Sequence, residues 1–212
     1  GDAWFANNYI SAFKDKGFYI DVGCYHPIKH SLTHKLYKMG WSGINIDISK
    51  ESIDLFNTFR SKDKNLNLGI STKTGFQDAF FEKKISTISS LKPDYLEKFP
   101  NNKKKFVRKI KTLTINDLFE KNEITEVDFL KIDCEGLDTS IIKTINFEKY
   151  KINFLSVEFL DPYADFINKK NNDIKSVHEL FFSSEMYNVL KKNFELLDHD
   201  QFAFLLVNKK IY

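Results

Sequence analysis

Short apolar runs alternate with helical patterns over the first 160 or so residues. Four runs, at residues 17–23, 43–47, 65–71 and 127–133, each end at a glycine or a polar residue, and a fifth follows at 152–159. Apolar residues at helical spacing lie between the first three runs, at residues 31–39 and 50–60. Strands that alternate with helices in this order are typical of right-handed βαβ crossovers and a parallel sheet.

The pattern changes toward the end of the chain. Three further segments have helical spacing, at residues 114–121, 137–145 and 174–190, and the last is the longest. Two apolar runs, 194–197 and 202–207, then close the chain and are too near each other for a helical crossover. We therefore predict an antiparallel hairpin at the C-terminus. The whole pattern predicts an α/β fold: a Rossmann-like, methyltransferase-type sheet that is mostly parallel, with helices on both faces.

Residues 74–111 fit this alternation least well. Prolines in turn-like settings occur at Lys92-Pro93-Asp94 and at Phe99-Pro100, and a run of three lysines follows at 103–105. We interpret 74–111 as a substrate-side insertion over the carboxyl edge of the sheet, within a single domain that spans 1–212. The alternative is a solvated surface loop, which is the favoured interpretation for the lysine run itself.

Composition excludes several classes of protein. The 212 residues are 42% hydrophobic and include 21 Phe, which is ample for a packed core. The net charge is only +3, and Arg60 and Arg108 are the only arginines among 32 cations, unlike a dedicated nucleic-acid binder. Cys24 and Cys134 are too few for a disulfide scaffold and are expected to be buried thiols near the pocket. No apolar run reaches the ~18 residues of a membrane span, so we expect a cytoplasmic protein.

The ends of the first two strands carry the chemistry. The first strand ends at Asp21-Val22-Gly23, and its single glycine excludes the G-x-G-x-x-G turn that binds a diphosphate. A ligand without phosphate, such as S-adenosylmethionine, needs one close backbone approach and a nearby carboxylate. Asp47 lies 24 residues beyond Gly23, close to the offset of an acid that binds ribose hydroxyls. Its alternative role is to cap the helix at 50–60, but Ser49 is better placed to do so.

Taken together, these motifs resemble the FkbM family of S-adenosylmethionine-dependent methyltransferases. The similarity covers roughly residues 17–160 and the closing hairpin. It is carried by the order and spacing of several segments more than by any one motif. These segments are residues 18–27, 40–47, 65–71, 111–114 and 128–136.

The resemblance implies methyl transfer, usually to an oxygen and often to a hydroxyl of a sugar or a secondary metabolite. It implies that Asp21 and Gly23 lie against the methionine half of the cofactor and that Asp47 holds the ribose. It places Ile70 and Ser71 near the adenine. The full set of cofactor-binding candidates is Asp21, Gly23, Cys24, Tyr25, Ser31, Asp47, Ile48, Ile70, Ser71 and Asp133.

Methyl transfer requires alignment of donor and acceptor and removal of a proton from the acceptor hydroxyl. The candidate catalytic residues are Asp133, Glu135 and His26, together with the carboxylates Glu158, at the end of the fifth run, and Asp161, just beyond it. An acidic cluster of this kind is alternatively a Mg²⁺ site, with Asp133 and Glu158 as ligands. Glu135 also has a second interpretation, as a first-turn acid that favours a helix N-terminus.

Two other functions compete with a methyltransferase that acts on a saccharide or small-molecule hydroxyl. Nucleic-acid methylation is suggested faintly by Asp161-Pro162-Tyr163, but this motif has one proline where amino-methylating enzymes have two, and it follows strand five instead of strand four. The other is a cofactor-binding or interaction domain without catalysis, because a fold does not by itself imply a reaction.

Overall fold

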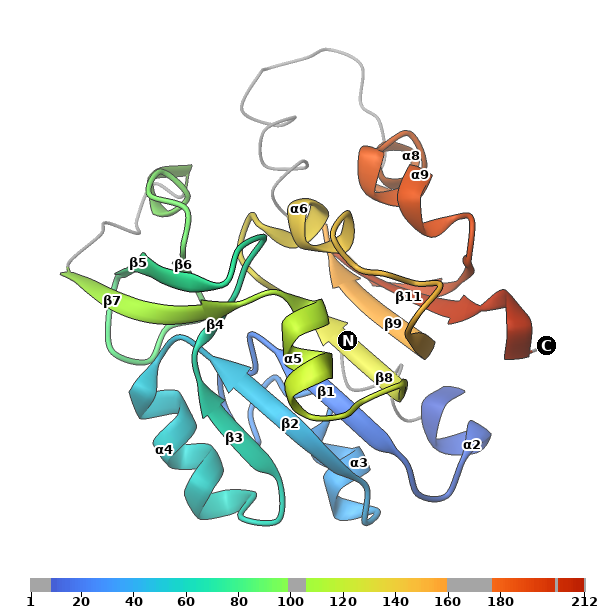
Figure 1. Ribbon diagram of the computed structural model, residues 1–212, viewed down its shortest axis with the longest axis horizontal. Helices are drawn as coiled ribbons and strands as arrows, with labels where there is room; N and C mark the ends of the chain where they lie inside the picture. The colour runs from blue at the N-terminus through green and yellow to red at the C-terminus, as the bar shows by residue number, and fades with distance from the viewer. Residues whose placement is uncertain (1–8, 99–105, 160–176, 201, 212) are drawn as a thin grey trace.

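A seven-stranded sheet forms the centre of the molecule (Figure 1). The computed structural model describes residues 9–98, 106–159, 177–200 and 202–211. Five neighbouring strands are parallel, and the last two form an antiparallel hairpin, as predicted. The strand order is β10-β11-β9-β8-β1-β2-β3. The strands are β1 (Phe18–Val22), β2 (Ser42–Asp47), β3 (Lys64–Asn67), β8 (Glu126–Ile132), β9 (Lys151–Glu158), β10 (Phe194–His199) and β11 (Ala203–Asn208).

Helices cover both faces of this sheet, because successive side chains of a strand point to opposite sides. On one face, Ile20 and Leu130 pack into a core with α5, α6 and α9. On the other face, their chain neighbours Tyr19 and Phe129 pack with α3. The predicted Rossmann-like architecture is therefore confirmed. The α-helices are α2 (Ser11–Phe13), α3 (His34–Lys38), α4 (Lys50–Phe59), α5 (Ile115–Lys121), α6 (Asp138–Ile142), α8 (Val177–Phe182) and α9 (Glu185–Leu190), with short 3₁₀ turns at Leu96–Lys98 and Lys209–Ile211.

Some helices are shorter than their apolar spacing predicted. The single helix expected at 174–190 is instead α8 and α9, because Ser184 has an extended backbone and its Oγ accepts a 3.1 Å hydrogen bond from the Tyr187 amide, which starts a new helix. Residues 174–176 of that prediction lie outside the described part of the chain. Among the described helices, none is long and apolar enough to cross a membrane.

The register of the parallel strands aligns their carboxyl ends. β1 pairs Val22 with Ile46 of β2 and with Ile132 of β8, and β8 pairs Ile132 with Val157 of β9. The residue that follows each of these four partners therefore lies at one edge of the sheet, where open α/β folds bind ligands. These residues are Gly23, Asp47, Asp133 and Glu158.

A second, smaller sheet begins where the main sheet ends. The strand predicted at 65–71 is in fact two: β3 belongs to the main sheet, and after Leu68 the chain enters β4 of the second sheet. The segment 74–111 supplies the other strands and is not a bare loop, although 99–105, with the lysine run, is outside the described residues. The strand order of the second sheet is β4 (Gly69–Ile70), β7 (Phe106–Leu113), β5 (Gly75–Phe81) and β6 (Ser89–Ser90).

Candidate functional site

A cavity of about 530 Å³ lies at the carboxyl ends of β1, β2, β8 and β9. Its volume is in the range of small-molecule sites, and Ser86, Thr87, Ser89 and Leu91, in and around β6 of the second sheet, contribute to its wall. The cavity brings together most of the residues singled out in the sequence. Those that line it are Gly23, Tyr25, Asp47, Ile48, Ile70, Asp133, Glu135 and Glu158.

Gly23 forms the tight turn after β1. Its φ of +72° is in the left-handed region that favours glycine. A Cβ atom at this position would lie 1.9 Å from the carbonyl oxygen of Asp133, so no other residue fits without displacing the backbone that follows β8. The Gly23 amide donates a 2.9 Å hydrogen bond to the Ile46 carbonyl oxygen, which ties the turn to β2. Gly23 therefore contributes only backbone atoms to the lining of the cavity.

Asp47 is held by both of its carboxylate oxygens. Oδ1 accepts a 2.7 Å hydrogen bond from the Ser49 amide, and Oδ2 accepts a 2.8 Å bond from the Tyr25 amide. Burial raises the pKa of Asp47 to about 6, although these two backbone hydrogen bonds act to lower it. Ser49 caps α4, since its Oγ accepts from the Ser52 amide, so Asp47 is not the cap and keeps lone pairs for a ligand.

Lys131 is a site residue that the sequence analysis did not single out. Its Nζ donates to the Gly23 carbonyl oxygen at 3.0 Å and to Asp133 Oδ2 at 3.1 Å, and it lies 3.6 Å from Asp21 Oδ1. Burial acts to lower the pKa of Lys131, but the adjacent carboxylates outweigh it and raise that pKa above its usual range. Asp21 and Lys131 are register partners on neighbouring strands, which only the sheet pairing reveals.

Two predicted cofactor residues lie beside the cavity in a buried polar network and not in its lining. Asp21 Oδ2 accepts a 2.7 Å hydrogen bond from Thr33 Oγ1. The buried guanidinium of Arg60 donates to Thr33 Oγ1, to Ser31 Oγ and to the carbonyl oxygen of Pro27. This network fixes the loop between β1 and α3. Asp21 and Ser31 therefore stabilise that loop and do not line the cavity. The network also explains why α3 begins at His34 and not near Ser31, whose hydroxyl binds Arg60.

Three other candidates are also outside the lining. Cys24 is buried against Ile53 and Phe56 of α4. Ser71 Oγ accepts a 2.8 Å hydrogen bond from Gln77 Nε2. His26 Nδ1 accepts from the amides of the two residues after Pro27, at 3.1 Å each, and so stabilises its own turn. Both cysteines are free thiols, and Cys134, which is half-buried, lines the cavity.

Three carboxylates gather at the ends of β8 and β9. Asp133, Glu135 and Glu158 can each place one oxygen within 4.8 Å of the others. Burial, followed by the negative charge of Asp133, raises the pKa of both Glu135 and Glu158 well above its ordinary value. Carboxylates so close to one another do not all ionise without a compensating positive charge. The cluster is therefore a place that holds protons or a cation. Asp161, the remaining acid predicted here, is outside the described residues.

Asp138 closes the loop below this cluster. Its Oδ1 accepts a 2.8 Å hydrogen bond from the Cys134 amide, and Oδ2 accepts one of 3.3 Å from the Gly136 amide. Burial raises the pKa of Asp138 to about 7, and the charge of Asp133 adds to this effect. Asp138 is the first-turn acid of α6, so the alternative helix-terminus role considered for Glu135 is not what the structure shows.

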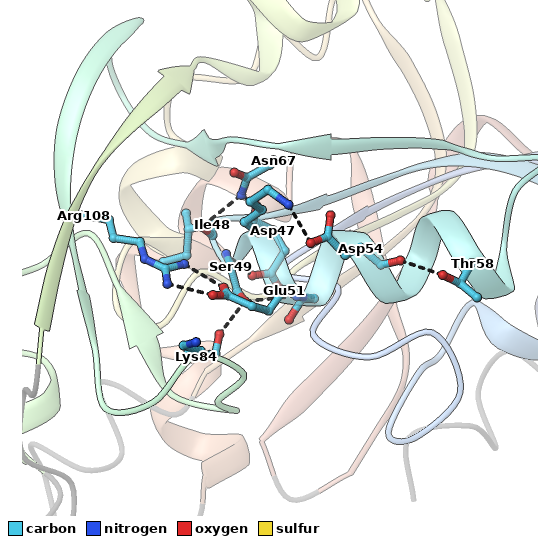
Figure 2. A network of polar contacts seen from close by, with 11 residues as sticks. Asp47, Ile48, Ser49, Glu51, Asp54, Thr58, Asn67, Lys84 and Arg108 are labelled. Carbon is cyan, nitrogen blue, oxygen red and sulfur yellow. Dashed lines mark hydrogen bonds and ion pairs between the residues drawn. The ribbon is translucent and has the colours of Figure 1, made fainter.

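Polar contacts join the second sheet to the start of α4 (Figure 2). Arg108 of β7 forms a two-pronged ion pair with Glu51, at 2.7 and 2.8 Å. Ser49 Oγ donates a 2.5 Å hydrogen bond to the Lys84 carbonyl oxygen. Since α4 begins just after Asp47, these contacts fix the second sheet beside the carboxylate at the end of β2.

Comparison with known proteins identifies the class and then the family. The model of the methyltransferase FkbM domain matches residues 21–195, which is most of the chain. The chain belongs to the FkbM family of methyltransferases, whose cofactor is S-adenosylmethionine. The predicted class, enzyme activity and cofactor are thereby confirmed. A search of curated proteins finds no match.

Two solved structures are similar to this chain at low sequence identity. An O-methyltransferase from Bacillus cereus in complex with SAH is 9% identical, with a TM-score of 0.49, over 98% of this chain and 80% of that one. A SAM-dependent methyltransferase from Methanosarcina mazei is 14% identical, with a TM-score of 0.40, over 92% of each chain. Structures of such low similarity do not indicate the substrate of this chain.

Proposed function

We propose that this protein transfers the methyl group of S-adenosylmethionine to a hydroxyl of a saccharide or another small metabolite. One observation carries the proposal. One cavity holds a partly buried carboxylate, Asp47, with both oxygens hydrogen-bonded to backbone amides, beside the turn at Gly23, and also a pair of carboxyl groups with raised pKa, Glu135 and Glu158. The first part suits a nucleoside, and the second suits the removal of a proton.

The residues at Gly23 and Asp47 fit the cofactor. A Cβ at Gly23 would displace the Asp133 backbone, which borders the cavity, and the partly buried Asp47 carboxylate offers acceptor lone pairs for the two ribose hydroxyls. Ile48 and Ile70 line the same wall and offer apolar surface for the adenine. When bound, S-adenosylmethionine supplies a methyl group on a positively charged sulfur. Asp133, which borders both parts of the cavity, would lie between donor and acceptor.

The carboxylate cluster would act on the acceptor. A base works best when its pKa is near the working pH, and burial raises the pKa of Glu135 and Glu158 in that direction. In the proposed reaction, a carboxylate of this pair would take the proton of the acceptor hydroxyl, whose oxygen would receive the methyl group that bound S-adenosylmethionine supplies. We assign the base to this pair and not to His26, which is outside the cavity lining.

The second sheet would select the acceptor within a single catalytic domain. Ser86 and Thr87, in the connection between β5 and β6, and Ser89 of β6 line the cavity with hydroxyl groups, and Ser156 and Asp200 add polar groups from the main sheet and its hairpin. A wall of this kind offers hydrogen bonds to a ligand that carries several hydroxyls, as a saccharide does. Such an acceptor is therefore favoured over an apolar one.

Calorimetry with S-adenosylhomocysteine tests the donor half. Asp47→Ala should weaken binding roughly 10- to 100-fold, because charge-assisted hydrogen bonds to the ribose are lost. Asp54→Asn is the matched control, since Asp54 is an exposed acid on α4 that pairs with Lys50 at 2.6 Å. Unchanged affinity in Asp47→Ala would remove the ribose assignment.

A methyl-release assay over glycans, small metabolites and nucleic acids tests the acceptor half. Transfer to a hydroxyl of a glycan or metabolite supports the proposal. Transfer to nucleic acid alone would replace it with the nucleic-acid alternative. Tight cofactor binding without transfer to any acceptor would support a non-catalytic domain.

A further inference from the structure

We propose that Ser90 and Tyr95 are positioning residues that hold Glu135 in its place at the cavity. The proposal rests on the proposed function, in which Glu135 belongs to the pair of carboxylates that take the acceptor proton. Ser90 is the last residue of β6, and Tyr95 directly precedes the 3₁₀ turn at Leu96–Lys98. Glu135 lines the cavity, whereas Ser90 and Tyr95 do not. Both would therefore affect the reaction only through Glu135.

Ser90 fixes the backbone of Glu135. Its Oγ donates a 2.7 Å hydrogen bond to the Glu135 carbonyl oxygen, and Ser90 is 1% exposed. The φ of Glu135 is +48°, in the left-handed region that is unfavourable for a residue with a Cβ atom, so neighbouring contacts must maintain it. The amides of Cys134 and Gly136 on either side are bound by Asp138. Ser90 supplies the contact to Glu135 itself, and this backbone conformation sets the direction of its side chain.

Tyr95 holds the side chain of Glu135. The Tyr95 hydroxyl donates a hydrogen bond to the Glu135 carboxylate, and Tyr95 is fully buried. Burial, followed by the negative charges of Glu135 and Glu158, raises the pKa of Tyr95 above its usual value, so the hydroxyl keeps its proton and acts as the donor. A hydrogen bond to a carboxylate is stronger than one between neutral groups. It therefore restricts the rotation of the Glu135 side chain.

Both contacts come from one turn of the second sheet. The Lys92 amide donates to Ser90 Oγ at 2.9 Å, and the Tyr95 amide donates to the Lys92 carbonyl oxygen at 3.2 Å. Ser90 is also paired with Phe80 of β5, which ties the turn to the rest of the sheet. The second sheet would therefore position a proton-accepting group in addition to forming a wall of the cavity.

Tyr95→Phe tests the hydroxyl alone, because it keeps the ring. We expect kcat to fall roughly 10- to 100-fold, with the KM for S-adenosylmethionine unchanged, since a small misplacement of a reacting group slows the reaction by this much. Ser90→Ala should lower kcat about tenfold for the same reason. The assay uses the best hydroxyl acceptor in the panel of glycans and metabolites. Tyr19→Phe is the matched control: it removes a buried hydroxyl that donates to Asp63, outside the lining, and should keep the wild-type kcat.

Two further measurements separate positioning from a general structural role. Because Tyr95 would act through Glu135, Tyr95→Phe should cause no further loss of kcat in a Glu135→Gln background. Crystal structures of Tyr95→Phe and Ser90→Ala provide a readout without activity. The Glu135 carboxyl should leave its position in the first, and the φ of Glu135 should leave the left-handed region in the second. Circular dichroism confirms that each variant is folded.

A folded variant with wild-type kcat, or with Glu135 unmoved in its crystal structure, would overturn the role of the residue that it replaces. Losses that add in the double variant would show that Tyr95 does not act through Glu135. The wild type separates these failures from failure of the proposed function. Wild-type transfer to a hydroxyl, with both variants at full speed, removes the positioning role only. A wild type that binds S-adenosylhomocysteine but transfers to no hydroxyl removes the proposed reaction and the positioning role with it.

Discussion

The guanidinium of Arg108 donates two hydrogen bonds, of 2.7 and 2.8 Å, to the carboxylate of Glu51 and so joins the second sheet to α4 (Figure 2). The side-chain hydrogen bond from Arg108 holds the pKa of Glu51 at about 2, well below its usual value. Because α4 starts next to Asp47, this pair links the wall that would face the acceptor to the carboxylate that would hold the ribose. It gives the second sheet a defined position over the cavity.

Arg108→Gln should therefore impair acceptor use more than cofactor binding. We expect a several-fold higher KM for the acceptor, nearly unchanged affinity for S-adenosylhomocysteine, and a loss of about 1 kcal/mol in the free energy of unfolding for this partly exposed pair. Steady-state kinetics, calorimetry and urea unfolding measure the three quantities. Asp54→Asn, which breaks an exposed pair on the same helix, is the control. An equal loss of cofactor affinity would show that the pair supports the whole site.

Gly23→Ala tests the close backbone approach. Gly23 and Gly40 both have positive φ, at +72° and +91°, so alanine is strained at either position. At Gly40 a Cβ meets only Lys16 Cε, at 3.9 Å, whereas at Gly23 it overlaps the Asp133 carbonyl oxygen. We expect Gly40→Ala to cost about 1 kcal/mol of unfolding free energy and Gly23→Ala about 2 to 4 kcal/mol. Only Gly23→Ala should also abolish S-adenosylhomocysteine binding. Equal effects on stability would contradict the predicted clash.

Cofactor affinity should fall in mild acid because of Asp47. Burial raises the pKa of Asp47 to about 6, so its ionised fraction drops as the pH falls below that value. At pH 5 about one molecule in ten carries the carboxylate, and S-adenosylhomocysteine affinity should be about tenfold below its plateau above pH 7. Calorimetry across this range measures the effect. Asp47→Asn, which cannot ionise, should bind weakly with no such pH dependence, and a dependence that persists in this variant would assign it to another group.

Lys131→Met should destabilise the protein strongly, since it leaves Asp21 and Asp133 without their shared ammonium. Removing one partner of a buried ionic cluster costs about 3 to 5 kcal/mol. The variant also frees the Gly23 carbonyl, so S-adenosylhomocysteine affinity should fall as well. Lys151→Met is the control, because Lys151 makes a half-exposed pair with Glu126 at 2.9 Å and should cost less than about 1 kcal/mol. Thermal melts and calorimetry measure both effects, and similar losses in the two variants would contradict a special role for Lys131.

Hydrophobic periodicity alone located the strands of the main sheet and the closing hairpin. Apolar runs of strand length that alternate with helical patterns have few compatible topologies, since crossovers are right-handed and parallel strands need a helix between them. Gly23 and Asp47 were predictable as site residues because each ends such a run. Ser49 was predictable as a cap, because a serine directly before a helical pattern binds the first free amides.

Tertiary structure alone decided which polar side chains meet. Lys131 lies inside an apolar run, and its partners Asp21 and Gly23 are more than 100 residues away, so only the pairing of β1 with β8 brings them together. The split of residues 65–71 between two sheets depends in the same way on β7, a distant strand that pairs with β4. Local sequence determines where strands and turns form, because dihedral preference and side-chain alternation are local. Charge compensation and burial depend on all the residues that lie nearby in the folded chain. The tertiary structure therefore decided the shape of the cavity and the pKa values of its carboxyl groups.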